Sequence, residues 1–346
     1  MQPRERAAAA EVRHLLYGQL VTQALCAVAE LGLPDMLAAG PLPAAELARR
    51  SATDPARRSA TDPARLRQLM TALVPYEIFS GPDEDAFALG RLGRALTTDA
   101  PGSALASALM AHRLMSPAWQ GLLDTVRSGV PAFDRVHGSD LFSHLEAHPD
   151  LRALFDRTQA ADLHLELDAL LATGRFAKAD TLVDVGGGNG ALLAALLHAH
   201  RHLRGILVDR PSAAAAARTH LAEAGVADRA TVTSGDFFKS LPPEGDLYLM
   251  REILHDWDDQ QCVTILRTCR FSMPRHGRLL VVELADETPG TGQEARAMGQ
   301  MSLYMLSVLP GRERHLADYT RLLDAAGLHV DAVHRLTGRK VMIEAR

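Results

Sequence analysis

The segment TLVDVGGGNG at residues 181–190 decides the fold. Its first five residues are β-branched or aliphatic apart from Asp184, which predicts a buried strand. Four glycines follow within five residues, and an apolar helical pattern begins at about Ala191. Glycine permits the tight turn and the close approach of a ligand to the backbone at such a junction. The segment therefore predicts the first strand, loop and helix of an α/β sheet.

Six further runs typical of strands follow, and helical patterns separate most of them. They are GILVDR at 205–210, ATVTSGD at 230–236, DLYLMREIL at 246–254, RLLVVELAD at 278–286, HVDAVHRL at 329–336 and KVMIEAR at 340–346. Alternating strands and helices predict a doubly wound parallel sheet. The turn at Thr337-Gly338 predicts that the closing hairpin inserts one antiparallel strand. We therefore expect a seven-stranded α/β domain over residues 176–346.

Residues 1–110 have a different texture, because apolar residues recur there at steps of three and four, as in helices. Two short predicted helices, PAAELARR at 43–50 and LRQLMTALV at 66–74, precede FALGRLGRALTTD at 87–99, where we expect a small strand pair. This order predicts a helix-turn-helix with a wing. Residues 111–175 are again helical, and we expect them to form a linking segment.

The segment RSATDPAR occurs twice in tandem, at 50–57 and 58–65. In each copy the Asp can cap a helix and the Pro can occupy its first position. Only one predicted helix follows, so we interpret the extra copy as a duplication at a surface turn, where an insertion costs little closure entropy.

Three carboxylates lie at or near the carboxyl ends of three successive predicted strands: Asp184, Asp209 and Asp236. Ligands of doubly wound sheets bind outside this edge. Gly186-x-Gly188-x-x-Ala191 satisfies a relaxed dinucleotide fingerprint, but the loop has no Lys or Arg, so a pyrophosphate would meet mostly negative charge. A ligand with an ammonium, a sulfonium and a ribose diol is complementary to these acids. S-adenosylmethionine (SAM) fits that description.

A histidine follows the fourth predicted strand, in LHDWDD at 254–259. We expect His255 to lie beside the ligand crevice and Asp256 to cap the next helix. The following strand carries Glu283, and neighbouring parallel strands bring these strand ends to one edge. A carboxylate beside an imidazole raises its basicity, as a general base requires. His255 is thus a candidate base with Glu283 as its partner, and a helix cap or a surface ion pair is the other interpretation of Glu283.

The composition limits the partners. The 346 residues carry a formal net charge of -5, which offers no basic face for a polyanion, so no nucleic-acid partner is expected.

The three cysteines lack C-x-x-C spacing, so no disulfide framework is predicted. The histidines of HAHRH at 198–202 do not share a helical face, so no metal site is predicted either. No apolar window approaches the roughly 18 residues of a membrane span, and no signal-peptide pattern is present, so we expect a cytoplasmic protein without a membrane partner.

The motifs together resemble the small-molecule O-methyltransferase family, which includes plant phenolic O-methyltransferases and bacterial polyketide-tailoring enzymes. They are LVDVGGGNG at 182–190, GDFF at 235–238, LHDWDD at 254–259 and GRER at 311–314. The resemblance implies a winged-helix-like dimerisation domain over 1–110, and hence a homodimer. It also implies a Rossmann-like class I methyltransferase domain over 176–346 that uses SAM, releases S-adenosyl-L-homocysteine (SAH) and needs no metal.

The resemblance assigns roles to individual positions. The residues expected to form the cofactor pocket are Asp184, Gly186, Gly188, Asp209, Asp236, Phe237, Arg251 and Trp257. Gly186 and Gly188 would line the methionine portion. Asp209 would bind the ribose, and Asp236 with Phe237 would hold the adenine.

His255 matches the family's general base, and Glu283 and Glu313 match the acids that flank it. The acceptor is expected to be an aromatic or polyketide hydroxyl. Residues of the segments that cap the site in relatives are candidates for its pocket: Trp119, Phe142, Phe155, Met301 and Met305.

One departure from the family keeps a second function open. Ser302 stands where bacterial relatives often have an acid, and some members of this fold bind SAM but catalyse hydroxylation, decarboxylation or pericyclic chemistry. A DNA-binding regulator and an NAD-dependent oxidoreductase are weaker alternatives. The second predicted helix of the helix-turn-helix is largely apolar, which disfavours a DNA-binding regulator. The three acids at the strand ends disfavour an NAD-dependent oxidoreductase.

Overall fold

The computed structural model describes residues 3–53, 61–83, 86–286 and 292–346. The chain divides into two compact units, Met1–Leu114 and Met115–Arg346. The segment 111–175, which we expected to be separate, belongs to the second unit from Met115 onward.

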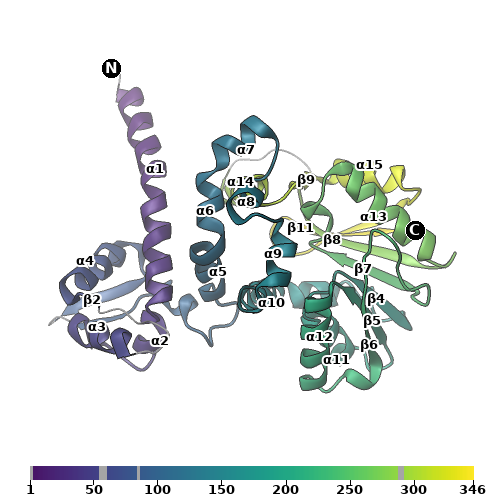
Figure 1. Ribbon diagram of the computed structural model, residues 1–346, viewed down its shortest axis with the longest axis horizontal. Helices are drawn as coiled ribbons and strands as arrows, with labels where there is room; N and C mark the ends of the chain where they lie inside the picture. The colour runs from purple at the N-terminus through teal and green to yellow at the C-terminus, as the bar shows by residue number, and fades with distance from the viewer. Residues whose placement is uncertain (1–2, 54–60, 84–85, 287–291) are drawn as a thin grey trace. The chain divides into compact units, whose positions relative to one another are not determined.

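The N-terminal unit is mainly helical (Figure 1). Its elements are α1 (Pro3–Glu30), α2 (Leu33–Leu37), β1 (Leu42–Pro43), α3 (Ala44–Thr53), α4 (Pro63–Leu73), η1 (Val74–Tyr76), β2 (Phe79–Asp83), β3 (Ala86–Leu89), η2 (Gly93–Leu96) and α5 (Leu105–Met110). The strands pair in the antiparallel order β1-β3-β2. The order of two helices and a hairpin agrees with the prediction, but the hairpin spans 79–89 and its expected position at 87–99 was wrong. The reason is packing, because the rings of Phe79 and Phe87 meet edge to face, with centroids 6.4 Å apart, in the core of this unit.

Local signals set the ends of α4. The Asp62 carboxylate accepts a hydrogen bond of 2.9 Å from the backbone N–H of Arg65, and Pro63 opens the first turn. The second repeat copy thus starts the helix, whereas Asp54 and Pro55 of the first copy lie outside the described residues. Pro75 lacks a backbone N–H, so α4 ends at Leu73 and the chain continues as the 3-10 turn η1.

Helices open the second unit, preceded by the π-turn η3 (Ala111–Met115). They are α6 (Ser116–Gln120), α7 (Leu122–Ser128), α8 (Ala132–His137), α9 (Leu141–Ala147) and α10 (Pro149–Ala172). The sheet follows, with strands β4 (Thr181–Val185), β5 (Arg204–Asp209), β6 (Ala230–Ser234), β7 (Leu247–Arg251), β8 (Arg278–Asp286), β9 (Arg314–His315), β10 (Val330–Arg335) and β11 (Lys340–Ala345). Between them lie α11 (Ala191–Ala199), α12 (Pro211–Glu223), η4 (Ala227–Arg229), η5 (Leu254–Asp256), α13 (Asp259–Ser272), α14 (Gln293–Val308) and α15 (Leu316–Ala325).

The main path of the sheet is β10-β11-β8-β7-β4-β5-β6. Strands β4 to β8 run parallel, and β11 is antiparallel to both of its neighbours, β8 and β10. The predicted seven-stranded, doubly wound sheet with one inserted antiparallel strand is confirmed, and the two-residue strand β9 is added beside β8. The strand order reverses between β4 and β7, which creates the crevice where such folds bind ligands.

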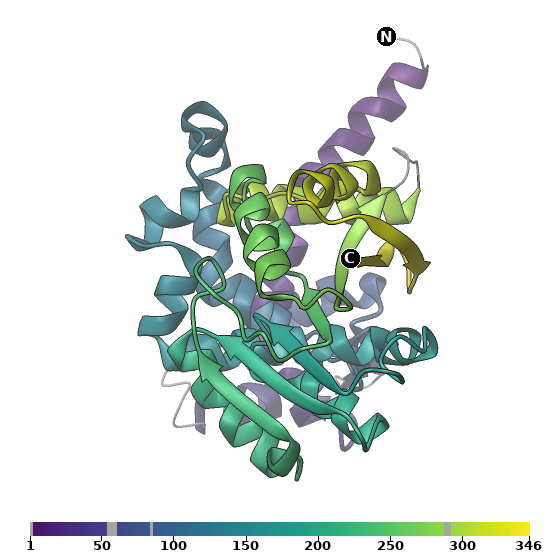
Figure 2. The same ribbon diagram turned by 90° about the vertical axis from the view of Figure 1, so that its right-hand side faces the viewer.

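Helices cover both faces of this sheet (Figures 1 and 2). One apolar cluster joins the sheet to α10, α11 and α12, and a second joins it to α13 and α15. Strand β4 is buried along nearly its whole length, because it contributes Leu182 to the first cluster and Val183 and Val185 to the second. Among the described residues, no helix is both long and apolar enough to cross a membrane.

Candidate active site

The glycine loop lies at the crevice, between β4 and α11. Gly186 and Gly188 have φ angles of 69° and 58°, a left-handed conformation that favours glycine. A Cβ at Gly188 would meet nothing closer than the Arg152 guanidinium at 3.9 Å, so this side of the loop is open. The Asp209 carboxylate accepts a hydrogen bond of 2.8 Å from the backbone N–H of Gly188. The loop and the end of β5 therefore form one wall.

A cavity of about 600 Å³ opens against this wall. Among the residues proposed from the sequence, those that line it are Gly186, Gly188, Asp209, Asp236, Phe237, Arg251, Trp257, Phe142 and Phe155. Asp184 lies behind the glycine loop instead: it is 2% exposed, and a Cβ on Gly187 would be 2.5 Å from its Oδ2. Burial raises the pKa of Asp184 to about 7, with a further contribution from the charge of Asp209.

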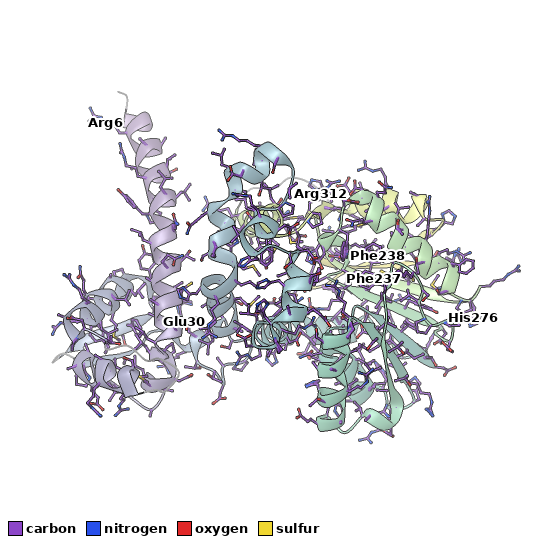
Figure 3. The ribbon with its side chains drawn as sticks, viewed as in Figure 1. Arg6, Glu30, Phe237, Phe238, His276 and Arg312 are labelled. Carbon is purple, nitrogen blue, oxygen red and sulfur yellow. The ribbon has the colours of Figure 1, made fainter. Side chains whose placement is uncertain are left out.

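Aromatic rings form one end of the cavity. Phe142 of α9 stacks on Trp257, with ring centroids 5.9 Å apart and planes inclined by 24°. Phe237 and Phe238 are neighbours (labelled in Figure 3). Their ring centroids are 5.3 Å apart, and both rings meet Trp257 edge to face. Asp236 is exposed beside them, and Lys239 binds it at 3.0 Å. A flat apolar group with a polar edge fits this end.

Arg152 and Asp156 of α10 also line the cavity, and sequence reasoning missed them. They form an ion pair of 2.9 Å, and both residues are 7% exposed. In the sequence, a charged pair four residues apart is typical of a solvated helical face, so nothing distinguished it. A buried guanidinium beside an open glycine loop can bind a carboxylate.

A strained turn carries the catalytic candidates. Glu252, directly after β7, has a φ of 54°, which is uncommon for a residue other than glycine. The Glu283 carboxylate on β8 accepts hydrogen bonds from the backbone N–H groups of Ile253 and Leu254, at 3.1 and 2.7 Å. Glu283 thus binds the first backbone N–H groups of the turn η5, which is the capping role that the sequence left open.

The His255 imidazole has carboxylates on both sides. Its Nδ1 lies 3.1 Å from Glu313 and 3.8 Å from Glu283, and its Nε2 lies 3.4 Å from Asp256. The structure therefore brings the three catalytic candidates His255, Glu283 and Glu313 together. Burial alone would lower the pKa of His255, but Glu283, Asp256 and Glu313 outweigh burial and raise this pKa well above its usual value.

Asp256 does not cap α13, and that expectation was wrong. The cap is Asp258, whose carboxylate accepts from the backbone N–H of Gln261 at 2.8 Å in a capping box. The turn η5 closes at Asp256, and its carboxylate faces His255 and lines the cavity. Burial raises the pKa of Asp256 to about 7.

Arg314 ties the GRER segment to the same turn. Its side chain is completely buried and donates to the carbonyl oxygens of Leu254 and Trp257 at 2.8 and 2.7 Å. It also binds Asp259 at the start of α13. Glu313, one residue earlier, is thereby held beside His255.

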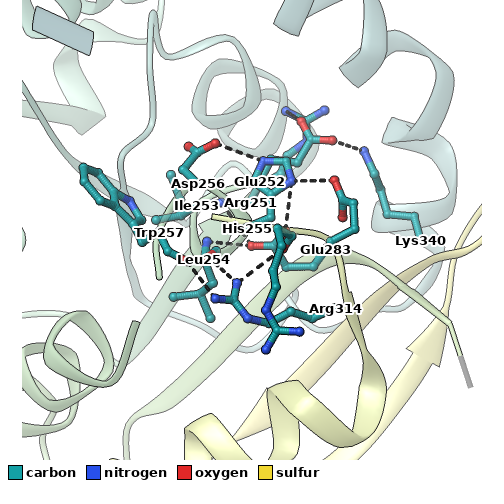
Figure 4. A network of polar contacts seen from close by, with 12 residues as sticks. Arg251, Glu252, Ile253, Leu254, His255, Asp256, Trp257, Glu283, Arg314 and Lys340 are labelled. Atoms are coloured by element: carbon teal, nitrogen blue, oxygen red, sulfur yellow. Dashed lines mark hydrogen bonds and ion pairs between the residues drawn. The ribbon is translucent and has the colours of Figure 1, made fainter. Parts of the chain in front are cut away.

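A network of buried charges supports the other side of the turn (Figure 4). Arg251 pairs with Glu166 of α10 and with Glu252, and Lys340 of β11 binds Glu252 at 2.6 Å and Glu166 at 2.7 Å. Burial would raise the pKa of Glu252, but Arg251 and Lys340 lower it to about 2. Glu252 is therefore a carboxylate at neutral pH.

Three further residues were expected in the acceptor pocket: Trp119, Met301 and Met305. Trp119 meets Tyr304 edge to face at 6.3 Å, Met305 is buried, and Met301 is 38% exposed. None of Trp119, Met301 and Met305 is among the residues that line the cavity, whereas Phe142 and Phe155 are. Ser302 of α14 is exposed.

Comparisons with known proteins match this chain over most of its length. The profile of an O-methyltransferase domain matches residues 119–329. The profile of an O-methyltransferase dimerisation domain matches residues 13–99.

Individual relatives agree with these matches. The O-methyltransferase SfmM3 of Streptomyces lavendulae is 40% identical over 338 residues, which span 96% of this chain and 99% of the relative. The aclacinomycin 10-hydroxylase RdmB of Streptomyces purpurascens is 36% identical over 90% of this chain and 82% of its own length. Among solved structures, the O-methyltransferase NcsB1 from neocarzinostatin biosynthesis, in complex with SAM and a naphthoic acid, is similar with a TM-score of 0.81 and 31% identity, covering 94% of this chain and 95% of the other.

Proposed function

Because the chain belongs to the O-methyltransferase family, and is a SAM-dependent O-methyltransferase, we propose that it methylates a hydroxyl group of an aromatic or polyketide-type natural product. One observation carries the proposal. The turn 252–257 contributes Asp256 and Trp257 to the cavity. The same turn carries His255, whose imidazole has the carboxylates of Asp256, Glu283 and Glu313 within 4 Å. A binding site and an acid–base cluster thus share one turn.

The cavity suits SAM in shape and charge. The open side of Gly188 gives the backbone a close approach to a ligand, and the aromatic end accepts a flat base. Asp209 offers carboxylate oxygen to ribose hydroxyls, and Asp236 lies beside Phe237, where an adenine amino group would need an acceptor. Arg152 supplies the positive charge that the carboxylate of the methionine portion requires.

When bound, SAM supplies a methyl group that its sulfonium already activates. The protein must then position the acceptor oxygen and take its proton, since a phenol with a pKa near 10 is only about one part in a thousand ionised at pH 7. We assign the proton to the cluster centred on His255, with Glu283 and Glu313 holding the imidazole. Acid–base assistance of this kind contributes on the order of 10²- to 10⁴-fold in rate, and positioning contributes more.

The similarity to RdmB favours one second candidate. That relative is named as a hydroxylase, so this chain could use the same cavity for a reaction that does not consume the methyl group. The exposed hydroxyl of Ser302, where the family often has an acid, is compatible with such a change.

One experiment separates the two candidates. Trideuteromethyl-labelled SAM is incubated with the enzyme and a panel of phenolic and polyketide acceptors, and the products are analysed by mass spectrometry. Methyl transfer predicts products heavier by one labelled methyl group, with SAH formed in equal amount. A product that forms without label, while SAM persists, would replace the proposal by the second candidate.

The N-terminal unit supports the proposal of a homodimer. Helix α1 exposes a row of large apolar side chains: Val12, Leu15, Leu16, Tyr17 and Leu20. Such a patch is typical of a surface that another protein covers, and the dimerisation profile includes all of it except Val12. Sedimentation equilibrium should give twice the chain mass of 37.4 kDa, and a monomer at micromolar concentration would contradict this assignment.

A further inference from the structure

Helix α9 forms part of the cavity wall although it lies outside the apolar cores of the sheet. Its Phe142 lines the cavity and stacks on Trp257, with ring centroids 5.9 Å apart. Leu141 and Leu145 of the same helix are buried, but neither belongs to the two apolar clusters that join the sheet to its helices. Packing against the sheet therefore does not fix the position of Phe142.

Polar contacts join α9 to the start of α12 instead. The Glu146 carboxylate accepts a hydrogen bond of 2.9 Å from the backbone N–H of Ser212 and one of 2.7 Å from the Ser212 hydroxyl. Arg210, directly before α12, donates to the Ser143 hydroxyl at 3.3 Å and lies 4.0 Å from Asp140, the cap of α9. The first N–H groups of a helix lack partners within it, and its dipole favours negative charge there, so a carboxylate suits the start of α12.

The start of α12 is itself a wall of the cavity. Asp209, Arg210 and Pro211 line it, and the Asp209 carboxylate accepts hydrogen bonds from the backbone N–H groups of Gly188 and Arg210, at 2.8 and 2.6 Å. Glu146 is not among the residues that line the cavity. It therefore links the helix that carries Phe142 to the segment that carries Asp209 without reaching the ligand space itself.

We propose that Glu146 is a positioning residue for the cofactor, which anchors α9 on α12 and thereby holds Phe142 against the adenine of SAM. The inference rests on the proposed placement of the adenine at the aromatic end of the cavity, and it adds a residue that does not touch the ligand. Without the anchor, α9 moves away with Phe142. SAM and SAH then lose one stacking surface and dissociate faster.

Binding of SAH tests the proposal without turnover, by calorimetry for affinity and by stopped-flow displacement for the dissociation rate. Phe142→Ala should weaken SAH by about 5- to 100-fold, the usual effect of removing an aromatic ring from a base. Glu146→Ala should weaken SAH by no more than Phe142→Ala does, and the dissociation rate should rise. Glu146→Gln should restore most of the affinity, because its amide can accept from the Ser212 N–H and donate to the Ser212 hydroxyl.

The double variant Glu146→Ala/Phe142→Ala separates positioning from a merely structural role. If Glu146 acts through Phe142, the double variant binds SAH no more weakly than Phe142→Ala alone, whereas independent effects add. Glu223→Ala is the matched control, because it removes an exposed glutamate at the other end of α12 and should keep wild-type affinity. If thermal unfolding shows that Glu146→Ala does not fold, Ser212→Ala removes one of the two contacts from the other side and should give the same pattern more weakly.

The outcomes are distinct from those of the methylation experiment. Wild-type SAH affinity in Glu146→Ala or in Phe142→Ala, or additive losses in the double variant, would overturn the role of Glu146 and leave methyl transfer standing. If no acceptor gains a labelled methyl group, the proposed function fails, and the SAH titrations still decide whether Glu146 positions Phe142. With an identified acceptor, Glu146→Ala should raise the KM for SAM and leave kcat unchanged, as for a loss of uniform binding.

Discussion

Gly311 lies directly against the main chain of His255. A Cβ on Gly311 would be 1.9 Å from the carbonyl oxygen of His255, and the next nearest atoms also belong to the backbone, in Asp256 and Trp257. No side chain can move aside to make room. The segment that carries Glu313 can therefore approach the turn that carries His255 this closely only because residue 311 has no side chain.

Gly311→Ala should consequently displace one segment from the other. We expect a destabilisation of about 1–3 kcal/mol, as for other overpacked sites, and a loss of methyl transfer that exceeds the loss of folded protein. Thermal unfolding and turnover measured on the same preparation check this. Gly299→Ala on α14 is the control, because nothing lies within 4 Å of its Cβ position and alanine favours a helix. Wild-type turnover in Gly311→Ala would show that the contact does not matter.

His255→Ala should lower turnover by roughly 10²- to 10⁴-fold and leave SAM affinity nearly unchanged. The reason is that the proposed function assigns the proton of the acceptor hydroxyl to the cluster centred on His255, whereas His255 is not among the residues that line the cavity. Turnover and calorimetric titration with SAM separate the two effects. His329→Ala, at a side chain that is 79% exposed, should alter neither quantity. A loss of SAM binding in His255→Ala would contradict the assignment.

Arg152→Gln should weaken SAM and SAH by about 10- to 100-fold, because a charge-assisted hydrogen bond to the ligand carboxylate contributes about 1.5–3 kcal/mol. Binding of 5′-methylthioadenosine, which lacks that carboxylate, should not change. Since Arg152 also pairs with Asp156, the double variant Arg152→Gln/Asp156→Asn removes the unpaired acid and serves as the control. Equal weakening of all three ligands would indicate a general distortion of the cavity.

Asp184→Asn should become more stabilising as the pH rises. Burial raises the pKa of Asp184 to about 7, above the usual value of 3.8, so the folded protein holds this proton more tightly than the unfolded chain. Asp184 therefore contributes most to the free energy of unfolding of the wild type at low pH. This contribution falls by roughly 1.4 kcal/mol per pH unit as the pH rises from about 4 to about 7. Asparagine does not titrate, so the difference in melting temperature between variant and wild type should widen from pH 5 to pH 8. A constant difference would show that Asp184 is ionised throughout.

Much of the catalytic unit could be predicted from the sequence because its signals are local. The strand runs and the glycine loop determined the sheet, and the strand ends located Asp209, His255 and Glu283, since parallel strands bring their carboxyl ends to one edge. Glu313 came from the resemblance, and the structure places it at hydrogen-bonding distance from His255.

What could not be predicted depends on contacts between distant segments. Asp256, Asp258 and Asp259 are all close enough in sequence to cap α13. Asp258 does so because the turn before it has the conformation that Glu283, on another strand, stabilises. Arg152 has the local pattern of a surface residue, and only the packing of α10 over the cavity buries it. The local sequence also could not show that Trp119 and Met301 are not among the residues that line the cavity.

The insertion of β11 between β8 and β10 has a consequence for biosynthesis. Residues 340–345 form an interior strand, and Lys340 completes the ion pairs that support Glu252 at the cavity wall. A nascent chain cannot finish this sheet while those residues are still inside the ribosomal exit tunnel. The catalytic unit therefore stays incomplete, with an open edge at β8, until translation has passed its final strand, and this interval is when the chain is most exposed to aggregation and most dependent on chaperones.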